Sequence, residues 1–302
     1  MRRSVVITLA ASAGVVILGG AIAAWAVTRP PSAEQVATEY LEALAAGESD
    51  AARALLGDDA LASLSPDITL ESATETISDV RVDHVGAAGG TATARFTFTL
   101  AGSTTRGEFT LVDGSQGWRV APDALGTLRV GTTRGDSVWL SGSLISTNDE
   151  AVALPAEYEI DAAPAEILAA SSAATLVPGN VTEVLLEPEL TDTAEARAQE
   201  TLDEYANACV VPADTIPRHC GIRVPWAADF AAMDGVSMTI TDYPVLALSD
   251  DGRFFATGGT LEVTVSGRKR SGTTETARYL TDDWSLQGTY DLEGNEMRLV
   301  VF

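Results

Sequence analysis

The chain has 302 residues and a formal net charge of −24 at pH 7, so it lacks the basic surface that nucleic-acid binding requires. An acidic surface of this kind repels nucleic acid, anionic lipid and other anionic polymers. The length is sufficient for two or three small domains, each with a hydrophobic core of its own.

Residues 1–31 are predicted to form a cytoplasmic tip, a transmembrane anchor and a short linker. An uncharged run covers residues 4–27 and follows Arg2 and Arg3. As a helix this run would be roughly 36 Å long, enough to cross a hydrocarbon core of about 30 Å and to make the cytoplasmic membrane a partner. The two arginines favour a cytoplasmic N-terminus, so we expect a single-pass protein of the cell membrane with an extracytoplasmic body.

The alternative for this segment is a signal peptide that is cleaved after export. Ala24-Trp25-Ala26 has the small-x-small pattern of a cleavage site. The apolar run is longer than the usual hydrophobic region of about 7–15 residues, however, which favours the anchor. Both interpretations place the body outside the cytoplasm.

Residues 32–123 are predicted to form a domain of helices and an antiparallel sheet. Ser32 and Gln35 have the spacing of a capping box at a helix start, and Gly47 can end that helix in the left-handed conformation. In residues 91–100 small or apolar side chains alternate with polar ones, which is typical of a strand with one buried face.

The order of helices followed by curved antiparallel strands resembles the cone-shaped fold of the nuclear-transport-factor-2-like superfamily. The most similar stretch is VATEYLEALAAGESDAARALL at 36–56, and Gly117-Trp118-Arg119-Val120 ends the last strand. The resemblance is to exported members from Gram-positive cell envelopes. It implies an α+β fold but no particular activity, because this fold hosts isomerases, hydrolases and many non-catalytic modules.

The rest of the chain is predicted to hold two further domains. Residues 124–190 contain short strands and resemble PEGA-like modules, which are small β-sandwiches of envelope proteins. Residues 191–302 begin with a helix and continue as a meander of strands. The complete prediction is an α+β chain with an N-terminal transmembrane helix, a cone domain, a β-sandwich module and a second helix-plus-sheet domain.

Cys209 and Cys220 are the two cysteines of the chain. In an exported protein an even pair at close spacing favours a disulfide. The alternative is a metal or redox site formed by Cys209, His219 and Cys220. This set lacks a fourth strong ligand and the usual spacing of metal ligands.

His84 and Tyr40 are the candidate pocket residues. His84 follows Val80 and Val82 at alternate positions, so it is predicted to lie at the end of an apolar strand face. The resemblance implies that this face lines a cone and that Tyr40 points into it, because isomerases of this fold pair a tyrosine donor with a buried carboxylate. A histidine at the rim of the core and a packed tyrosine are the simpler alternatives.

Two charged clusters have competing interpretations. Arg268-Lys269-Arg270 is the basic run of an acidic chain. It is interpreted either as an edge that resists unwanted strand pairing or as a docking site for an acidic partner. Asp250-Asp251-Gly252 has the acids of a calcium loop without its alternating ligands or final glutamate, so a surface turn is favoured.

The chain contains no catalytic sequence motif that we recognise, and it has only two histidines. We therefore predict no enzymatic activity, no cofactor and no metal. The predicted function is a membrane-tethered extracytoplasmic module that binds or positions an envelope protein. The alternative is a small-molecule or enzymatic pocket in the cone domain near His84 and Tyr40.

Overall fold

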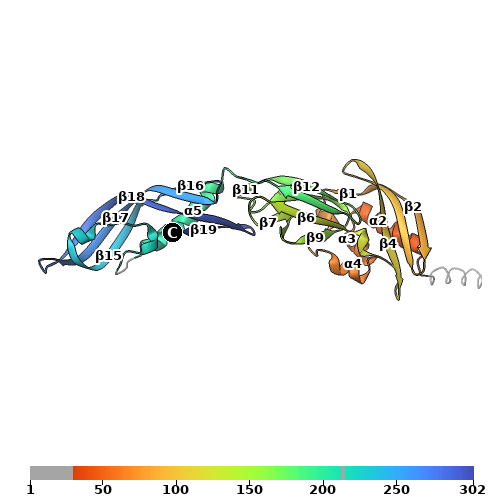
Figure 1. The fold of residues 1–302 in the computed structure, drawn as a ribbon, viewed down its shortest axis with the longest axis horizontal. Helices are drawn as coiled ribbons and strands as arrows, with labels where there is room; N and C mark the ends of the chain where they lie inside the picture. The colour runs from red at the N-terminus through yellow and green to blue at the C-terminus, as the bar shows by residue number, and fades with distance from the viewer. Residues whose placement is uncertain (1–29, 212–214) are drawn as a thin grey trace, which may run out of the picture.

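In the computed structural model, which describes residues 30–211 and 215–302, strands account for 53% of the structure and helices for 20% (Figure 1). The prediction of an α+β fold is therefore wrong, because the chain is mostly β and arranged in several sheets with few helices. The physical reason is the extent of the strands. Long strands such as β17 (Arg253–Lys269) and β18 (Thr274–Glu293) outweigh the few short helices.

The predicted transmembrane helix is also corrected. Across residues 30–211 and 215–302 no helix is long and apolar enough to cross a membrane. The longest helix described is α5 (Ala194–Cys209), whose 16 residues include several charged side chains. The predicted segment 4–27 lies outside the described residues. The structure therefore does not support the predicted single-pass location at the cell membrane.

Three helices open the described chain. The capping box predicted at Ser32 is present, with the Gln35 N–H donating to Ser32 Oγ and the Ser32 N–H donating to Gln35 Oε1. Gly47 ends the first helix with a φ of 72°, as predicted. The helices are α2 (Ala33–Ala46), α3 (Ser49–Ala54) and α4 (Asp58–Ser63).

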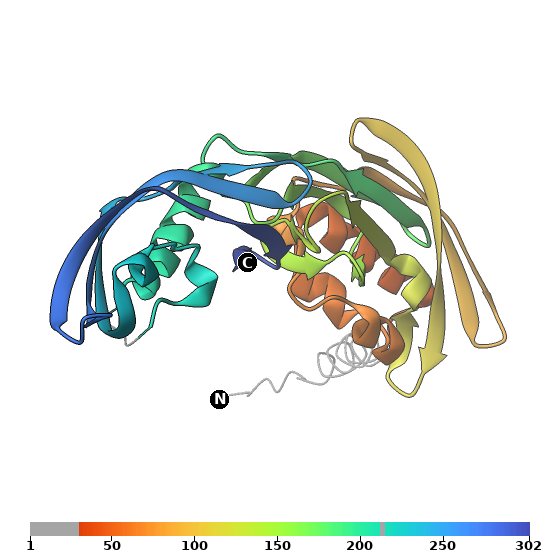
Figure 2. The same cartoon turned by 60° about the vertical axis from the view of Figure 1, so that its left-hand side comes forward.

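A four-stranded antiparallel sheet follows and packs one face against α2 (Figure 2). The alternation predicted in residues 91–100 is observed, because every second side chain of that strand is buried against the helices. In spatial order the strands are β2 (Ser78–Ala88), β3 (Thr91–Leu100), β4 (Ser103–Gly114) and β5 (Gly117–Val120).

Residues 124–190 fold into shorter strands that pack against the same helices. Up to residue 190, the strands outside the four-stranded sheet are, in chain order, β1 (Glu75–Thr76), β6 (Gly126–Thr132), β7 (Ser137–Leu140), β8 (Ser143–Ser146), β9 (Glu150–Ala153), β10 (Ala156–Ala162), β11 (Leu168–Ala169), β12 (Ser171–Leu176), β13 (Val181–Leu186) and β14 (Glu189–Leu190). They form three sheets, and the pair β6–β13 is parallel.

One hydrophobic core joins these strands to the helices and the first sheet. It runs from Ala33 to Leu186, and β1 pairs with β10 across what was predicted to be a domain boundary at 123/124. The division into domains at 123/124 and 190/191 stays a prediction. Below, residues 30–190 are called the N-terminal lobe and residues 191–302 the C-terminal lobe.

The C-terminal lobe is a curved sheet wrapped around α5, with a second hydrophobic core (Figures 1 and 2). Its last strand pairs with β18. Besides β17 and β18 its strands are β15 (Phe230–Asp242), β16 (Val245–Leu248) and β19 (Glu296–Val301).

The predicted disulfide between Cys209 and Cys220 is present and joins the end of α5 to the segment that enters this sheet. Both cysteines are buried. The indole N–H of Trp284, itself buried on β18, donates to the backbone carbonyl of Cys220 at 2.7 Å. The bridge therefore fastens the helix to the centre of the sheet.

A small buried cluster and several polar contacts connect the lobes, among them an ion pair between Arg197 and Glu166 at 2.8 Å. Ala162 and Leu168 of the N-terminal lobe share this cluster with Ala194 of the C-terminal lobe. The Gly294 N–H donates to Asp136 Oδ1 at 2.8 Å, and an Arg134–Asp250 ion pair lies beside it at 2.9 Å.

Stability of the N-terminal lobe is predicted to fall in acid through Glu71. The Ser49 hydroxyl donates to Glu71 Oε2 at 2.6 Å, and this hydrogen bond is the main cause that lowers the pKa of Glu71 from 4.5 to about 2. The resulting stabilisation is complete above the unfolded pKa of 4.5 and is lost as the pH falls toward about 2.

We therefore expect Glu71→Gln to lower the urea midpoint of the N-terminal lobe near neutral pH and to lower it progressively less below about pH 4. Glu187→Gln, at an exposed position, is the control and should leave the midpoint unchanged. A Glu71→Gln deficit that stays constant down to about pH 2 would contradict this assignment.

Removal of the disulfide is predicted to destabilise the C-terminal lobe selectively. The bridge closes a loop with a sequence separation of 11, so Cys209→Ala with Cys220→Ala should lower the free energy of unfolding of that lobe by about 3 kcal/mol. Hydrogen exchange resolved by peptide measures each lobe separately. Equal loss of protection in both lobes would show that the bridge does not act locally.

Candidate functional site

Tyr40 lies inside the N-terminal core and lines no surface cavity of the described chain that we identify. Its ring packs edge-on against Phe109, with the ring centroids 5.3 Å apart. The hydroxyl donates to the Ala124 carbonyl at 3.3 Å, and burial raises the pKa of this phenol well above its usual range. The side chain thus has the contacts of a core residue with one satisfied hydrogen bond.

His84 lies on the opposite face of the sheet from Tyr40. The pairing register between β2 and β3 shifts by one residue, from Val82 opposite Phe96 to His84 opposite Arg95. This bulge reverses the alternation that the sequence suggested, because an extra residue turns the following side chain to the other face. His84 is exposed beside Arg95, whereas Val85 returns to the core side. The structure therefore does not bring His84 and Tyr40 together.

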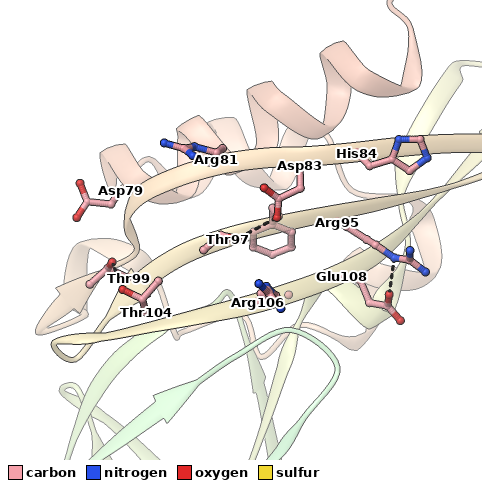
Figure 3. Close-up of a pocket in the computed structure, with 12 residues that line it drawn as sticks. Asp79, Arg81, Asp83, His84, Arg95, Thr97, Thr99, Thr104, Arg106 and Glu108 are labelled. Carbon is pink, nitrogen blue, oxygen red and sulfur yellow. Dashed lines mark hydrogen bonds and ion pairs between the residues drawn. The ribbon is translucent and has the colours of Figure 1, made fainter.

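His84 contributes to a groove of about 940 Å³ on the outer face of the first sheet (Figure 3). Thr97 lies near its centre, and Phe96 and Gly107 also line it. The other residues that line it are Asp79, Arg81, Asp83, Arg95, Thr99, Thr104, Arg106 and Glu108. We call this surface the arginine face.

The charged groups of the arginine face lie in rows across the strands. Arg81 on β2 and Arg106 on β4 both pair with Thr97 on the strand between them. The backbones of the two arginines are therefore about 10 Å apart, and one row across the sheet carries both side chains. In the next row Arg95 forms an ion pair with Glu108 at 3.3 Å. The Thr97 hydroxyl donates to Asp83 Oδ2 at 2.8 Å.

Arg81 and Arg106 form no ion pair with any residue of segments 30–211 and 215–302. Both side chains are exposed and stand on the side of the sheet that α2 does not cover. Both guanidinium groups therefore lie without an ion-pair partner among the described residues, beside Asp79 and Asp83, in a chain with a net charge of −24.

The predicted basic run lies at the tip of the β17–β18 hairpin, at the far end of the molecule from the arginine face (Figure 1). Lys269 forms an ion pair with Glu275, which follows it across the turn. Arg268 and Arg270 are exposed. The structure gathers no pocket around Arg268, Lys269 or Arg270 that we identify in the described chain.

The other two polar candidates have structural explanations. Because both thiols are joined in the disulfide, the alternative of a metal held by Cys209, His219 and Cys220 is wrong. In the acidic turn, Asp251 accepts a hydrogen bond from the Ser249 hydroxyl and Asp250 binds Arg134 across the lobe junction. The favoured interpretation of this segment as a surface turn agrees with these contacts.

The three arginines of the arginine face carry no sequence motif of their own. Alternation in residues 91–100 does place Arg95 on the polar side. Arg81 and Arg106 become its neighbours only through the pairing of three strands, which depends on the Ala101-Gly102 turn and on the bulges in β2. Recognition of that turn would have predicted the Arg106–Thr97 pair.

Gly107 is predicted to be required for the packing of Phe96 in the N-terminal core. A Cβ at this position would lie 2.6 Å from the Phe96 ring, which is buried and cannot move away. We expect Gly107→Ala to destabilise the N-terminal lobe by about 1–3 kcal/mol through overpacking. Urea unfolding measures this change.

Gly86→Ala is the matched control in the same sheet. A Cβ there would lie 3.1 Å from Nε2 of the exposed His84, whose side chain is free to turn toward solvent. Its cost should stay below about 0.5 kcal/mol, since alanine is itself favoured over glycine in a strand. Equal effects of the two substitutions would contradict the assigned packing.

Comparison with known proteins identifies no relative, because no protein family, curated protein or solved structure matches the chain. The resemblances of residues 32–123 to the nuclear-transport-factor-2-like superfamily and of residues 124–190 to PEGA-like modules stay predictions. The geometry of the chain's own side chains is therefore the basis for inferring its function.

Proposed function

We propose that this protein is a non-enzymatic binding module and that its arginine face binds an acidic segment of a partner protein. The observation that carries the proposal is the row formed by Arg81, Thr97 and Arg106, in which two exposed guanidinium groups flank a hydroxyl. Guanidinium groups recognise carboxylates by paired hydrogen bonds, which gives the site a preference for acidic side chains.

The shape of the site favours a macromolecular partner. The groove lies on the outer surface of a sheet, and its charged side chains are exposed rather than enclosed. Catalytic sites instead hold acids, bases or nucleophiles in a pocket that restricts water. The alternative of a shared His84 and Tyr40 pocket has less support, since the two side chains lie on opposite faces of the sheet.

The charge of the chain limits the partner further. Charges separated by more than about 8 Å are largely screened at physiological ionic strength, so the arginines and acids of the groove weigh more than the rest of the chain when a short acidic segment binds. A nucleic acid presents phosphates over a much longer span and would meet the surrounding acidic surface. A protein segment with a few carboxylates fits the two unpaired arginines better.

The test uses a fluorescein-labelled threonine peptide of about nine residues, the length of a typical strand, with two glutamates separated by one threonine. We expect saturable binding by fluorescence anisotropy at low salt, weakened as salt is added. Replacing both Arg81 and Arg106 by glutamine should lower the affinity about fivefold or more, because each exposed ion pair contributes up to about 1 kcal/mol.

The control is Arg278→Gln with Arg298→Gln, which removes the same charge from exposed positions on the other lobe. This variant should bind the peptide as the wild type does. A second control is a peptide with glutamines in place of the glutamates, which should bind at least about fivefold more weakly. Absence of saturable binding, or an equal loss in the charge-matched variant, would refute the proposed function.

A further inference from the structure

One edge of the first sheet is open beside the arginine face. Strand β4 pairs with β3 along residues 103–112 but with β5 only along residues 111–114. Within the described residues no strand covers the outer edge of β4 from Ser103 to Thr110. This segment therefore presents backbone hydrogen-bonding groups to the solvent.

The direction of each backbone group follows from the hairpin turn. Two residues, Ala101 and Gly102, connect Leu100 to its partner Ser103, and such a turn is closed by a hydrogen-bonded pair. Hydrogen-bonded and non-hydrogen-bonded pairs then alternate along the ladder. The N–H and C=O groups of Thr104, Arg106 and Glu108 consequently point away from β3.

The contacts of Thr110, the next residue in this alternation along β4, support this assignment. The Thr110 N–H donates to the Asp123 carboxylate at 3.1 Å, and the Thr110 carbonyl accepts from the Ala121 N–H at 2.9 Å. Both groups thus point to the side opposite β3. The Asp123 carboxylate thus accepts the outward hydrogen bond of the β4 backbone at Thr110, where the open segment ends.

The two edges of this sheet differ in their protection. Strand β2 has two register shifts and a positive φ of 49° at Asp79, features that interrupt an edge and discourage further pairing. Strand β4 keeps an unbroken register with β3 from Leu100–Ser103 to Thr91–Val112. It also contains no proline. The open edge of β4 is therefore a regular template for another strand.

We propose that an extended segment of a partner protein adds to this edge as a further strand, with an acidic side chain opposite Arg106. This inference rests on the proposed function of the arginine face and specifies how the partner docks. In an antiparallel arrangement, like that of the other strands of this sheet, its residue opposite Arg106 would form a hydrogen-bonded pair with a Cα separation of about 5.5 Å. Because paired side chains share a face, its carboxylate would lie beside the Arg106 guanidinium.

The geometry assigns unequal roles to the two unpaired arginines. Arg106 is on the strand that receives the partner, whereas Arg81 lies two strands farther across the sheet. The added strand would be about 5 Å from the backbone of Arg106 and about 15 Å from that of Arg81. Loss of Arg106 should therefore weaken binding at least about threefold more than loss of Arg81.

The closing experiment removes one edge hydrogen bond without changing charge. The Thr104 N–H points to solvent, so Thr104→Pro keeps the β3–β4 ladder but blocks strand addition, as proline does at natural edges. We expect this substitution to weaken binding of the glutamate peptide at least about tenfold more than Thr104→Ala does, because both remove the hydroxyl but only alanine retains the N–H.

A measurement on the wild type keeps the test independent of that variant's folding. With saturating peptide, the amide protons of Thr104, Arg106 and Glu108 should exchange at least about tenfold more slowly by NMR. A peptide N-methylated at the alternate positions that face the edge keeps its carboxylates but should lose binding.

Each other outcome overturns the strand-addition model. If the N-methylated peptide binds normally and the three amides stay unprotected, the partner docks through charge alone, and the proposed function survives without strand addition. If no acidic peptide binds, both proposals fail. If the same amides become protected without peptide as the protein concentration rises, a second copy of this chain occupies the edge instead.

Discussion

Burial of the inner face of the β3–β4 hairpin against helix α2 is the constraint on which the arrangement of the N-terminal lobe depends. Phe96, Phe98 and Phe109 fill the space between the sheet and the helix, and their rings contact one another or Tyr40. Because side chains alternate between the two faces of a strand, this burial directs Arg95, Thr97 and their neighbours to the opposite surface. The arginine face is thus a consequence of the core.

Local departures from regular pairing refine that surface. The bulge between Val82 and His84 moves the histidine from the core side to the outer side and returns Val85 to the core. Gly107 permits a similar adjustment, because only a residue without a Cβ leaves room for the Phe96 ring. The bulge returns Val85 to the core where strict alternation would not, Gly107 leaves space for the buried Phe96 ring, and both features are located at the groove.

The C-terminal lobe also packs one face of a sheet against a helix, but a disulfide holds this helix in place. Its sheet curves around α5, and the Cys209–Cys220 bridge holds the end of that helix against the strands. Gly259 lies at a register shift in β17, where the Trp284 indole packs against its backbone. The hydrogen bond from Trp284 to Cys220 then connects the bridge to the core. Each lobe therefore has its own core, joined by the small cluster around Leu168 and Ala194.

Local patterns in the sequence were sufficient to predict several individual elements. The capping box at Ser32 and the alternation in residues 91–100 depend on neighbours in the sequence, and the disulfide could be predicted because the chain has two cysteines. The α+β class was wrong because local helix signals do not reveal how much of the chain is strand, and long strands such as β17 and β18 make the structure mostly β.

The candidate site, by contrast, was decided by tertiary structure. Arg81 and Arg106 are far apart in the sequence and carry no motif, and only the registers of β2, β3 and β4 place them on either side of Thr97. A single extra residue in β2 was enough to reverse the predicted direction of His84. Composition alone determined that the chain is acidic, and strand pairing determined where its cations meet, because register is set by long-range packing rather than by local sequence.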